Sequence, residues 1–235
     1  MQVTAIVVAA GKGLRLGLGF NKVYAELRGK PVLAYSLETL DKNSDIGQII
    51  VVAAEAEIDE AKALIAKYGI SKATNVVPGG SSRFRSVAAA LPYISCQSDV
   101  VLVHDGARPL LEEADLAAVI AAGSADSGAI LATPVTDTIK RVELYDEPAA
   151  DKSVGYIVGT PERKRLWRAL TPQVFPLDLF LEAYGSLGCK VTDDASLFEA
   201  LGLSVKIVEG SDDNIKITNP KDLLMADLIL QERNK

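Results

Sequence analysis

A glycine-rich, basic stretch near the N-terminus has the residue types of a site for phosphate groups. Residues 9–15 read AAGKGLR, and Lys22 follows at a short distance. Glycines without a Cβ let the backbone approach a ligand closely, and successive N–H groups in such a turn form a concave site for anions. Arg15 and Lys22 would add fixed positive charge. We predict a triphosphate site here, against the alternative of a strand-to-helix turn with solvated basic side chains.

The spacing of this stretch does not fit two familiar phosphate-binding motifs. A dinucleotide fingerprint requires a third glycine where the chain has Leu16. A P-loop requires Gly-Lys followed by Ser or Thr at the end of the loop, and that sequence is also missing. The spacing therefore indicates a third kind of loop.

A second polar segment, HDGARP at residues 104–109, follows the expected strand 99–103. The first loop follows the apolar run 3–8 in the same way. Ligands of open α/β sheets bind outside the carboxyl ends of the strands, so both segments should face one crevice. Asp105 could bind a nucleotide or metal, or could cap a structural turn. His104, the single histidine, is expected to anchor this turn through hydrogen bonds and not to act as an acid or base.

The charge composition argues against a nucleic-acid-binding protein. The formal net charge is −6, whereas nucleic-acid binding depends on a broad basic face. An acidic protein that binds a small polyanion must gather its basic residues locally. Lysine and arginine occur together with glycine or asparagine in three stretches, residues 11–22, 79–85 and 214–216.

The length and the apolar content predict a soluble α/β protein. The chain has 235 residues, of which 49% are hydrophobic, enough for one large core. No apolar run approaches the ~20 residues of a membrane span, and the N-terminus lacks the features of a signal peptide. Cys96 and Cys189 are too few for a disulfide framework. We expect a cytoplasmic protein with reduced thiols.

Strand-like and helix-like segments alternate along most of the chain, which predicts a mainly parallel sheet with helices on both faces. Trp167 and Phe175 are interpreted as core residues. We see no linker, so residues 1–235 are predicted to form one domain. The expected strands are 3–8, 48–53, 73–77, 99–103, 128–134 and 203–208, and the expected helices are one from Pro31, 57–68, 83–94, 112–122, 176–187, one capped by residues 192–194 and ending at Leu201, and 220–232.

Residues 135–160 interrupt this alternation and predict a protruding β-arm. Residues 136–142 and 153–158 alternate like strands on either side of the polar tip 146–148. A two-stranded hairpin is marginally stable alone, so it should pack on something, most simply the same arm of a second subunit. The alternative is a flexible loop with strand-like composition.

Seven blocks of residues resemble a known family, the 2-C-methyl-D-erythritol 4-phosphate cytidylyltransferases. They occur in the order and approximate spacing of that family and extend over nearly the whole chain. The blocks are AAGKGLR with Lys22, GGSSRFRSV at 79–87, HDGARP at 104–109, PVTDTIKR at 134–141, ALTPQVF at 169–175, TDDAS at 192–196 and DNIKIT at 213–218.

The resemblance implies a Rossmann-like nucleotidyltransferase fold and a homodimer formed through the β-arm. It implies transfer of CMP from CTP to 2-C-methyl-D-erythritol 4-phosphate, with Mg²⁺ as the cofactor, in the non-mevalonate isoprenoid pathway. No nucleic acid or membrane is implied as a partner.

The resemblance also implies roles for individual residues. It assigns catalysis to Arg15, Lys22 and Lys216, and both a nucleotide and a metal contact to Asp105. Ser81 and Thr192 each have an alternative role, which is only to cap a helix. Ser82 is expected to have that capping role. The further nucleotide-binding residues are Ala9, Ala10, Gly11, Gly13, Gly80, Ser81 and Ser86, and the substrate-binding residues are Asp105, Arg108, Thr192 and, toward the neighbouring subunit, Thr138 and Arg163.

The chain departs from the family pattern on both sides of the predicted catalytic lysine. It has Asn21-Lys22-Val23 where the family usually has Pro-Lys-Gln.

Three other interpretations of the sequence would differ from this one in identifiable ways. A ribitol-5-phosphate cytidylyltransferase would share most blocks and differ in its acceptor. A non-catalytic nucleotide-binding module would have little need for Arg15, Lys22 and Lys216 together, and an NAD-dependent oxidoreductase would require the missing third glycine.

Overall fold

The structure is a computed structural model that describes residues 1–11, 20–123, 125–145, 154–186 and 193–233. Three predicted site residues, Gly13, Arg15 and Thr192, lie outside these ranges, as does the predicted tip of the arm. No helix in the described ranges is long and apolar enough to cross a membrane.

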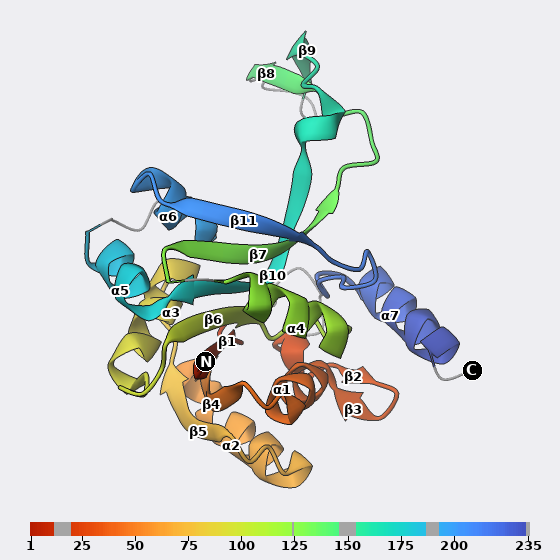
Figure 1. The fold of residues 1–235 in the computed structure, drawn as a ribbon. Helices are drawn as coiled ribbons and strands as arrows, with labels where there is room; N and C mark the ends of the chain where they lie inside the picture. Colours follow the sequence, from red (N-terminus) through yellow and green to blue (C-terminus); the bar gives the residue numbers. More distant parts are fainter. Residues whose placement is uncertain (12–19, 124, 146–153, 187–192, 234–235) are drawn as a thin grey trace.

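A seven-stranded sheet runs through the centre of the described chain (Figure 1). The alternation of strands and helices predicts a mainly parallel sheet, and this prediction is confirmed because β10 alone among these strands runs antiparallel to its neighbours. In sheet order the strands are β11 (Ser204–Glu209), β7 (Ser127–Pro134), β10 (Trp167–Pro176), β6 (Val100–Asp105), β1 (Val3–Val8), β4 (Ile46–Ala53) and β5 (Ala73–Pro78).

β1 lies between β4 and β6, and its register places the predicted polar segments together. Val8, the last residue of β1, pairs with Val52 on one side and with Asp105 on the other. Residues 3–7 are all buried, as expected for a strand covered on both faces. The segments that follow β1 and β6 therefore leave the sheet at the same edge.

β10 was not predicted as a strand. Within it, Gln173 pairs with Val103 of β6 and with Ile130 of β7, so the strand fills the space between two parallel strands. Phe175 is buried at 0% exposure, as predicted. The prediction that Trp167 is a core residue is wrong: its side chain is 37% exposed, because β10 begins outside the body of the protein, toward the arm.

Helices cover both faces of the sheet, as predicted. The helices α1, α2 and α4 contribute Leu37, Leu64 and Leu116 to one apolar cluster, and α3, α5 and α6 contribute Val87, Phe180 and Phe198 to the other. The predicted helix 83–94 ends early, at Ala90, and a 3-10 turn, Leu91–Tyr93, follows. The helices are α1 (Val32–Lys42), α2 (Ile58–Tyr68), α3 (Arg83–Ala90), α4 (Glu113–Ala122), α5 (Leu177–Ser186), α6 (Ala195–Ala200) and α7 (Pro220–Arg233).

A smaller apolar cluster fastens the C-terminal helix to the N-terminal half. Ala226 and Ile229 of α7 pack with Leu27, which lies in a short hairpin of β2 (Glu26–Leu27) and β3 (Lys30–Pro31). Ile217, just before α7, is buried in the same cluster, and its N–H donates to the carbonyl of Ala107 at 2.8 Å. This packing brings the segment around Lys216 to the polar edge of the sheet.

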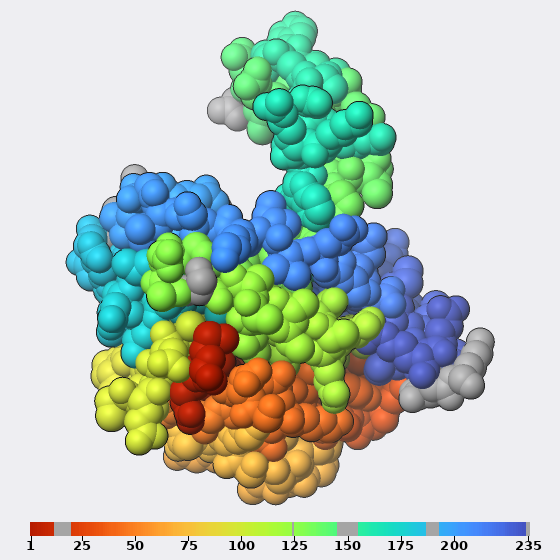
Figure 2. All heavy atoms as spheres, in the orientation of Figure 1, coloured from red at the N-terminus to blue at the C-terminus, as the bar shows by residue number. Residues whose placement is uncertain are grey.

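The predicted arm is a two-stranded antiparallel hairpin of β8 (Arg141–Tyr145) and β9 (Val154–Gly159). Figure 2 shows it projecting away from the rest of the molecule. Its first strand is shorter than predicted, since residues 136–140 are not paired and β8 begins at Arg141. Leu144, Tyr156 and Ile157 are each more than 60% exposed, so the arm presents apolar side chains to its surroundings.

Candidate active site

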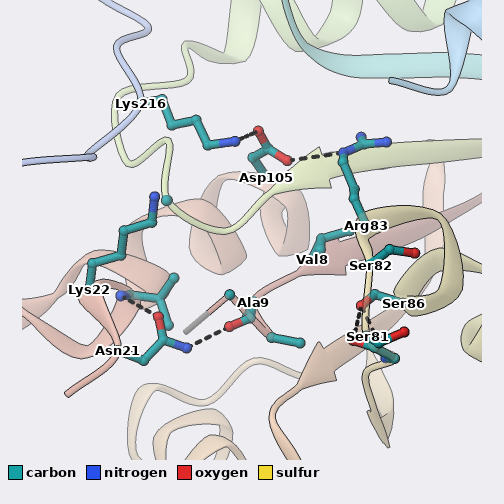
Figure 3. A pocket seen from close by; sticks show the side chains of 15 residues that line it. Val8, Ala9, Asn21, Lys22, Ser81, Ser82, Arg83, Ser86, Asp105 and Lys216 are labelled. Carbon is teal, nitrogen blue, oxygen red and sulfur yellow. Dashed lines mark hydrogen bonds and ion pairs between the residues drawn. The ribbon is translucent and has the colours of Figure 1, made fainter. Parts of the chain in front are cut away.

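A cavity of about 400 Å³ opens at the edge of the sheet where β1 and β6 end (Figure 3). Nine of the predicted site residues line it, and they come from segments far apart in the chain. These nine are Ala9, Ala10, Gly11, Lys22, Gly80, Ser81, Ser86, Asp105 and Lys216. Six further residues complete the lining: Val8, Asn21, Val23, Ser82, Arg83 and Ala107.

Asn21 connects the segment that carries Lys22 to the end of β1. Its side-chain amide donates to the carbonyl oxygen of Ala9 at 2.7 Å and to the carboxylate of Glu57 at 2.8 Å. Its side-chain oxygen accepts from the N–H of Val23 at 3.4 Å, at the start of a 3-10 turn, Lys22–Tyr24. Asn21 is buried, so its bonds to Ala9 and Val23 are shielded from water. Asn21, one of the two residues beside Lys22 that depart from the family pattern, thus fixes the backbone on which Lys22 stands.

The glycine-serine segment before α3 forms the opposite wall of the cavity (Figure 3). A Cβ on Gly79 would lie 2.3 Å from Cβ of Ala10, so only glycine fits between this segment and the end of β1. Buried Ser86 accepts from the N–H of Gly80 at 3.1 Å and holds the segment against α3. The predicted cap is also present, since Ser82 accepts from the N–H of Arg85 at 3.2 Å.

Asp105, at the end of β6, is surrounded by positive charge. Its Oδ2 lies 2.6 Å from Nζ of Lys216, and its Oδ1 lies 3.7 Å from Nε of Arg83. Arg108 adds a third cation at 3.9 Å. Burial by itself would raise the pKa of the Asp105 carboxyl, but these three cations outweigh burial and hold that pKa well below its usual range. The Asp105 carboxyl is therefore ionised, and its negative charge lies beside three cations.

His104 is a structural anchor, as predicted. It is fully buried, and burial lowers the pKa of its imidazole to about 4, so the ring is neutral at pH 7. Its Nδ1 lies 3.1 Å from the hydroxyl of Thr171, which also accepts from the N–H of Asp105 at 3.1 Å. The ring therefore links the end of β6 to β10.

A second, smaller cavity of about 170 Å³ shares part of its wall with the first. Arg83, Asp105 and Lys216 line both cavities. The predicted substrate residue Arg108 lines only the second, where its side chain is buried and donates to the carbonyl of Asn214 at 2.6 Å. The other lining residues are Ala169, Leu170, Thr171, Gln173 and Asp193. One carboxylate and two cations thus stand where two ligand-sized spaces meet.

Two predicted substrate residues lie away from these cavities. Thr138 and Arg163 are both exposed near the base of the arm, and the guanidinium of Arg163 donates to the carbonyl of Thr136 at 2.8 Å. They were expected to reach the site of a neighbouring subunit, so this assignment stays a prediction.

The sequence interpretation missed two polar residues of the wall, Arg83 and Asn21. Arg83 lies inside a block that was quoted for other residues, and its basic character was the available signal. Asn21 could not have been identified from residue type, since its contacts depend on the positions of Ala9 and Glu57.

The residues of the site fit a magnesium ion whose ligands come mainly from the phosphates of a substrate. In the described parts of the chain, no group of three or more His, Cys, Asp or Glu side chains could hold a metal ion. In enzymes that use nucleotides, Mg²⁺ is commonly bound by one or two protein carboxylates together with substrate phosphates and waters. Asp105 is a carboxylate on the cavity wall and would be the protein ligand of such an ion.

Comparisons with known proteins agree with this geometry. A family model described as 2-C-methyl-D-erythritol 4-phosphate cytidylyltransferase matches residues 3–232. The chain is 42% identical to the protein of that name from Alkaliphilus metalliredigens, over 99% of this chain and 94% of the relative. It is 41% identical to the one from Halalkalibacterium halodurans, with 100% of both chains covered.

Solved structures show the same relationship. A 4-diphosphocytidyl-2C-methyl-D-erythritol synthase from Anaerococcus prevotii aligns with a TM-score of 0.81 and 32% identity, over 98% of both chains. A 2-C-methyl-D-erythritol 4-phosphate cytidylyltransferase from Thermus thermophilus aligns with a TM-score of 0.76 and 28% identity, over 98% of this chain and 100% of the other. The chain belongs to the 2-C-methyl-D-erythritol 4-phosphate cytidylyltransferase family.

Proposed function

We propose that this protein transfers CMP from CTP to 2-C-methyl-D-erythritol 4-phosphate, releasing pyrophosphate, as a step of non-mevalonate isoprenoid synthesis. The observation that carries the proposal is the shared wall of Arg83, Asp105 and Lys216 between the two cavities. CTP occupies the larger cavity and the acceptor the smaller one, so the two phosphate groups that react meet at this wall.

The nucleotide half of the site has the features that a triphosphate requires. Ala9, Ala10 and Gly11 present a backbone with small or no side chains, and Lys22 and Lys216 supply positive charge to the same cavity. From the resemblance of their block, we assign Gly13 to the backbone that approaches the nucleotide and Arg15 to the positive charge beside the triphosphate. Gly80, Ser81 and Ser86 form the wall that we assign to cytosine.

The reaction requires charge stabilisation more than proton transfer. An oxygen of the acceptor phosphate attacks the α-phosphorus of CTP, and the bond from that phosphorus to the pyrophosphate oxygen breaks. A phosphomonoester loses its second proton with a pKa near ~6, so the attacking group is already largely ionised at neutral pH. Fixed cations offset the repulsion between the two anions and stabilise the charge on the transferring phosphoryl group.

In this scheme Lys22, Arg15 and Lys216 stabilise the phosphorus at which substitution occurs. Asp105 and the triphosphate oxygens would hold Mg²⁺, which supplies further neutralisation of the phosphate charge. Arg108 and Thr192 orient the acceptor, and neutral His104 keeps the end of β6 in place.

A homodimer completes the proposal. The exposed apolar side chains of the arm are unusual for a hairpin that faces water, and a second arm would cover them. Thr138 and Arg163 lie near the base of the arm. Because of this position, we assign them to binding the acceptor phosphate in the site of the neighbouring subunit.

The experiment that tests the activity measures pyrophosphate release from CTP and Mg²⁺ with each of two acceptors. We expect turnover with 2-C-methyl-D-erythritol 4-phosphate and little with ribitol 5-phosphate. Turnover with ribitol 5-phosphate alone would contradict the assigned acceptor. CTP binding without turnover of either acceptor would indicate a non-catalytic nucleotide-binding module.

A further inference from the structure

Arg83 lies at the wall between the two cavities and has no role in the scheme above. It is the first residue of α3, directly after the capping residue Ser82, so its backbone is fixed at the start of a helix. Its side chain is 24% exposed and lines both cavities. Its side chain can therefore contact a ligand in either cavity.

Two carboxylates from distant parts of the chain flank the Arg83 side chain. Its Nη2 lies 2.6 Å from Oδ2 of Asp194, the residue before α6, and its Nε lies 3.7 Å from Oδ1 of Asp105. Figure 3 shows the Arg83 side chain reaching upward from the α3 segment to meet Asp105. The planar guanidinium presents donors in a fixed fork, so it can face two carboxylates at once, whereas a lysine ammonium is a point charge.

Asp194 is a rigid anchor for this arrangement. Its side chain is 1% exposed, and its Oδ1 accepts a hydrogen bond of 2.5 Å from the hydroxyl of Tyr184. The ring of Tyr184 stacks on Phe84, the residue next to Arg83, with ring centroids 4.7 Å apart. These contacts join Asp194, Tyr184 and α3 to one another. They therefore fix the position of the Arg83 side chain.

Arg83 and Lys216 lie beside different oxygens of the Asp105 carboxylate. Arg83 attracts Oδ1 of Asp105, while Lys216 attracts Oδ2 of the same carboxylate. Without Arg83, the carboxylate would turn more fully toward Lys216 and neutralise more of its charge. Lys216 would then stabilise the transferring phosphoryl group less well, even with CTP bound.

We propose that Arg83 is a positioning residue that Asp194 holds in place, and that it orients Asp105 so that Lys216 keeps its charge for the transfer step. This inference rests on the proposed function. It predicts an effect on turnover that exceeds the effect on CTP affinity, because Arg83 acts through Asp105 and Lys216.

The test uses variants that separate positioning from stability. Arg83→Gln alone would leave buried Asp194 without its cationic partner and could unfold the protein. The double variant Arg83→Gln with Asp194→Asn removes both charges together, and the amide oxygen that it introduces can still accept from the Tyr184 hydroxyl. Arg83→Lys keeps the charge balance but loses the fork. Arg85→Gln, at an exposed position on the same helix, is the matched control.

Thermal unfolding is measured together with kcat and the KM for CTP at saturating acceptor. We expect the double variant and Arg83→Lys to fold and to lose about tenfold or more in kcat, with the KM for CTP changed less than about threefold. The control should match the wild type.

Three results would overturn the proposal. These are a folded double variant with wild-type kcat, a raised KM for CTP with kcat unchanged, or, if the double variant does not fold, an Arg83→Lys variant with wild-type kcat. Wild-type turnover tests the proposed function separately, since the inference depends only on the ratio of variant to wild type.

Discussion

The ammonium group of Lys216 lies 2.6 Å from Oδ2 of Asp105, although 111 residues separate them in the chain. The contact joins the loop before α7 to the end of β6. It holds a cation and an anion side by side on the wall that both cavities share. The pair is therefore expected to act as a unit in catalysis.

A double-mutant cycle tests this unit. Asp105→Asn and Lys216→Met should each lower kcat/KM by on the order of 10²-fold, because Lys216→Met removes a cation at the reacting phosphates and Asp105→Asn removes the carboxylate proposed to hold Mg²⁺. The double variant should lose much less than the product of the two losses, since residues that act together are not additive. Lys221→Met, at an exposed position in the first turn of α7, is the control. Strictly multiplicative losses would show that the two residues act independently.

Lys22 should be essential for turnover and dispensable for folding. Lys22→Ala is expected to purify as a folded protein and to lose on the order of 10²-fold or more in kcat, because it removes a charge that stabilises the transition state. Steady-state kinetics and circular dichroism check the two parts. Lys42→Ala, an exposed lysine of α1, should behave like the wild type. Activity of Lys22→Ala within a few-fold of wild type would remove its assigned role.

Gly79 should be required for CTP binding. In Gly79→Ala the new Cβ would lie 2.3 Å from Cβ of Ala10 and 3.1 Å from Oγ of Ser86, so the wall of the cavity must shift. We expect the KM for CTP to rise about tenfold or more. Gly185→Ala in α5, where no atom lies within 4 Å of the added Cβ, should leave it unchanged. Equal KM values for the two variants would show that this contact has no effect on the nucleotide.

Buried His104 should make the protein less stable in mild acid. Its pKa is about 4 in the folded state and 6.5 in an unfolded chain, so the unfolded state binds the extra proton as the pH falls through 6.5. Stability from this group is complete above pH 6.5 and declines until about pH 4, where the folded ring also takes up a proton. The expected loss between pH 7 and 5 is about 2 kcal/mol.

Urea unfolding of the wild type and of His104→Asn measures this effect. His104 is the only histidine, so no other imidazole contributes. The difference in unfolding free energy between the two proteins should shrink as the pH falls from 7 to 5. A difference that stays constant with pH would mean that folding leaves the pKa of His104 unchanged.

The arm should hold two subunits together. Leu144 of β8 and Ile157 of β9 are 67% and 64% exposed, and Ile157 pairs with Val142, so both side chains lie on one face of the hairpin. Leu144→Glu with Ile157→Glu should convert a dimer to a monomer in light scattering. Glu143→Gln, on the other face, is the control. A wild-type monomer, or a double variant that remains dimeric, would contradict this interface.

Much of the fold follows from local patterns. Apolar runs such as Val3–Val8 and Val100–Val103 form strands because they are covered on both faces, and the alternation with helices predicts a parallel sheet. β10 was missed because its polar and proline residues obscure the strand pattern, and Trp167 was misplaced because burial depends on where a strand enters the sheet.

The residue types of the site and, through the order of the blocks, the family can be derived from the amino-acid sequence. Which side chains meet depends on the folded chain: examples are the Asn21 bonds to Ala9 and Glu57, the two carboxylates beside Arg83, and the approach of Lys216 to Asp105. Hydrogen bonds and ion pairs act over only a few ångströms. Residues far apart in the chain reach that range only when strand order, register and helix packing have placed their backbones.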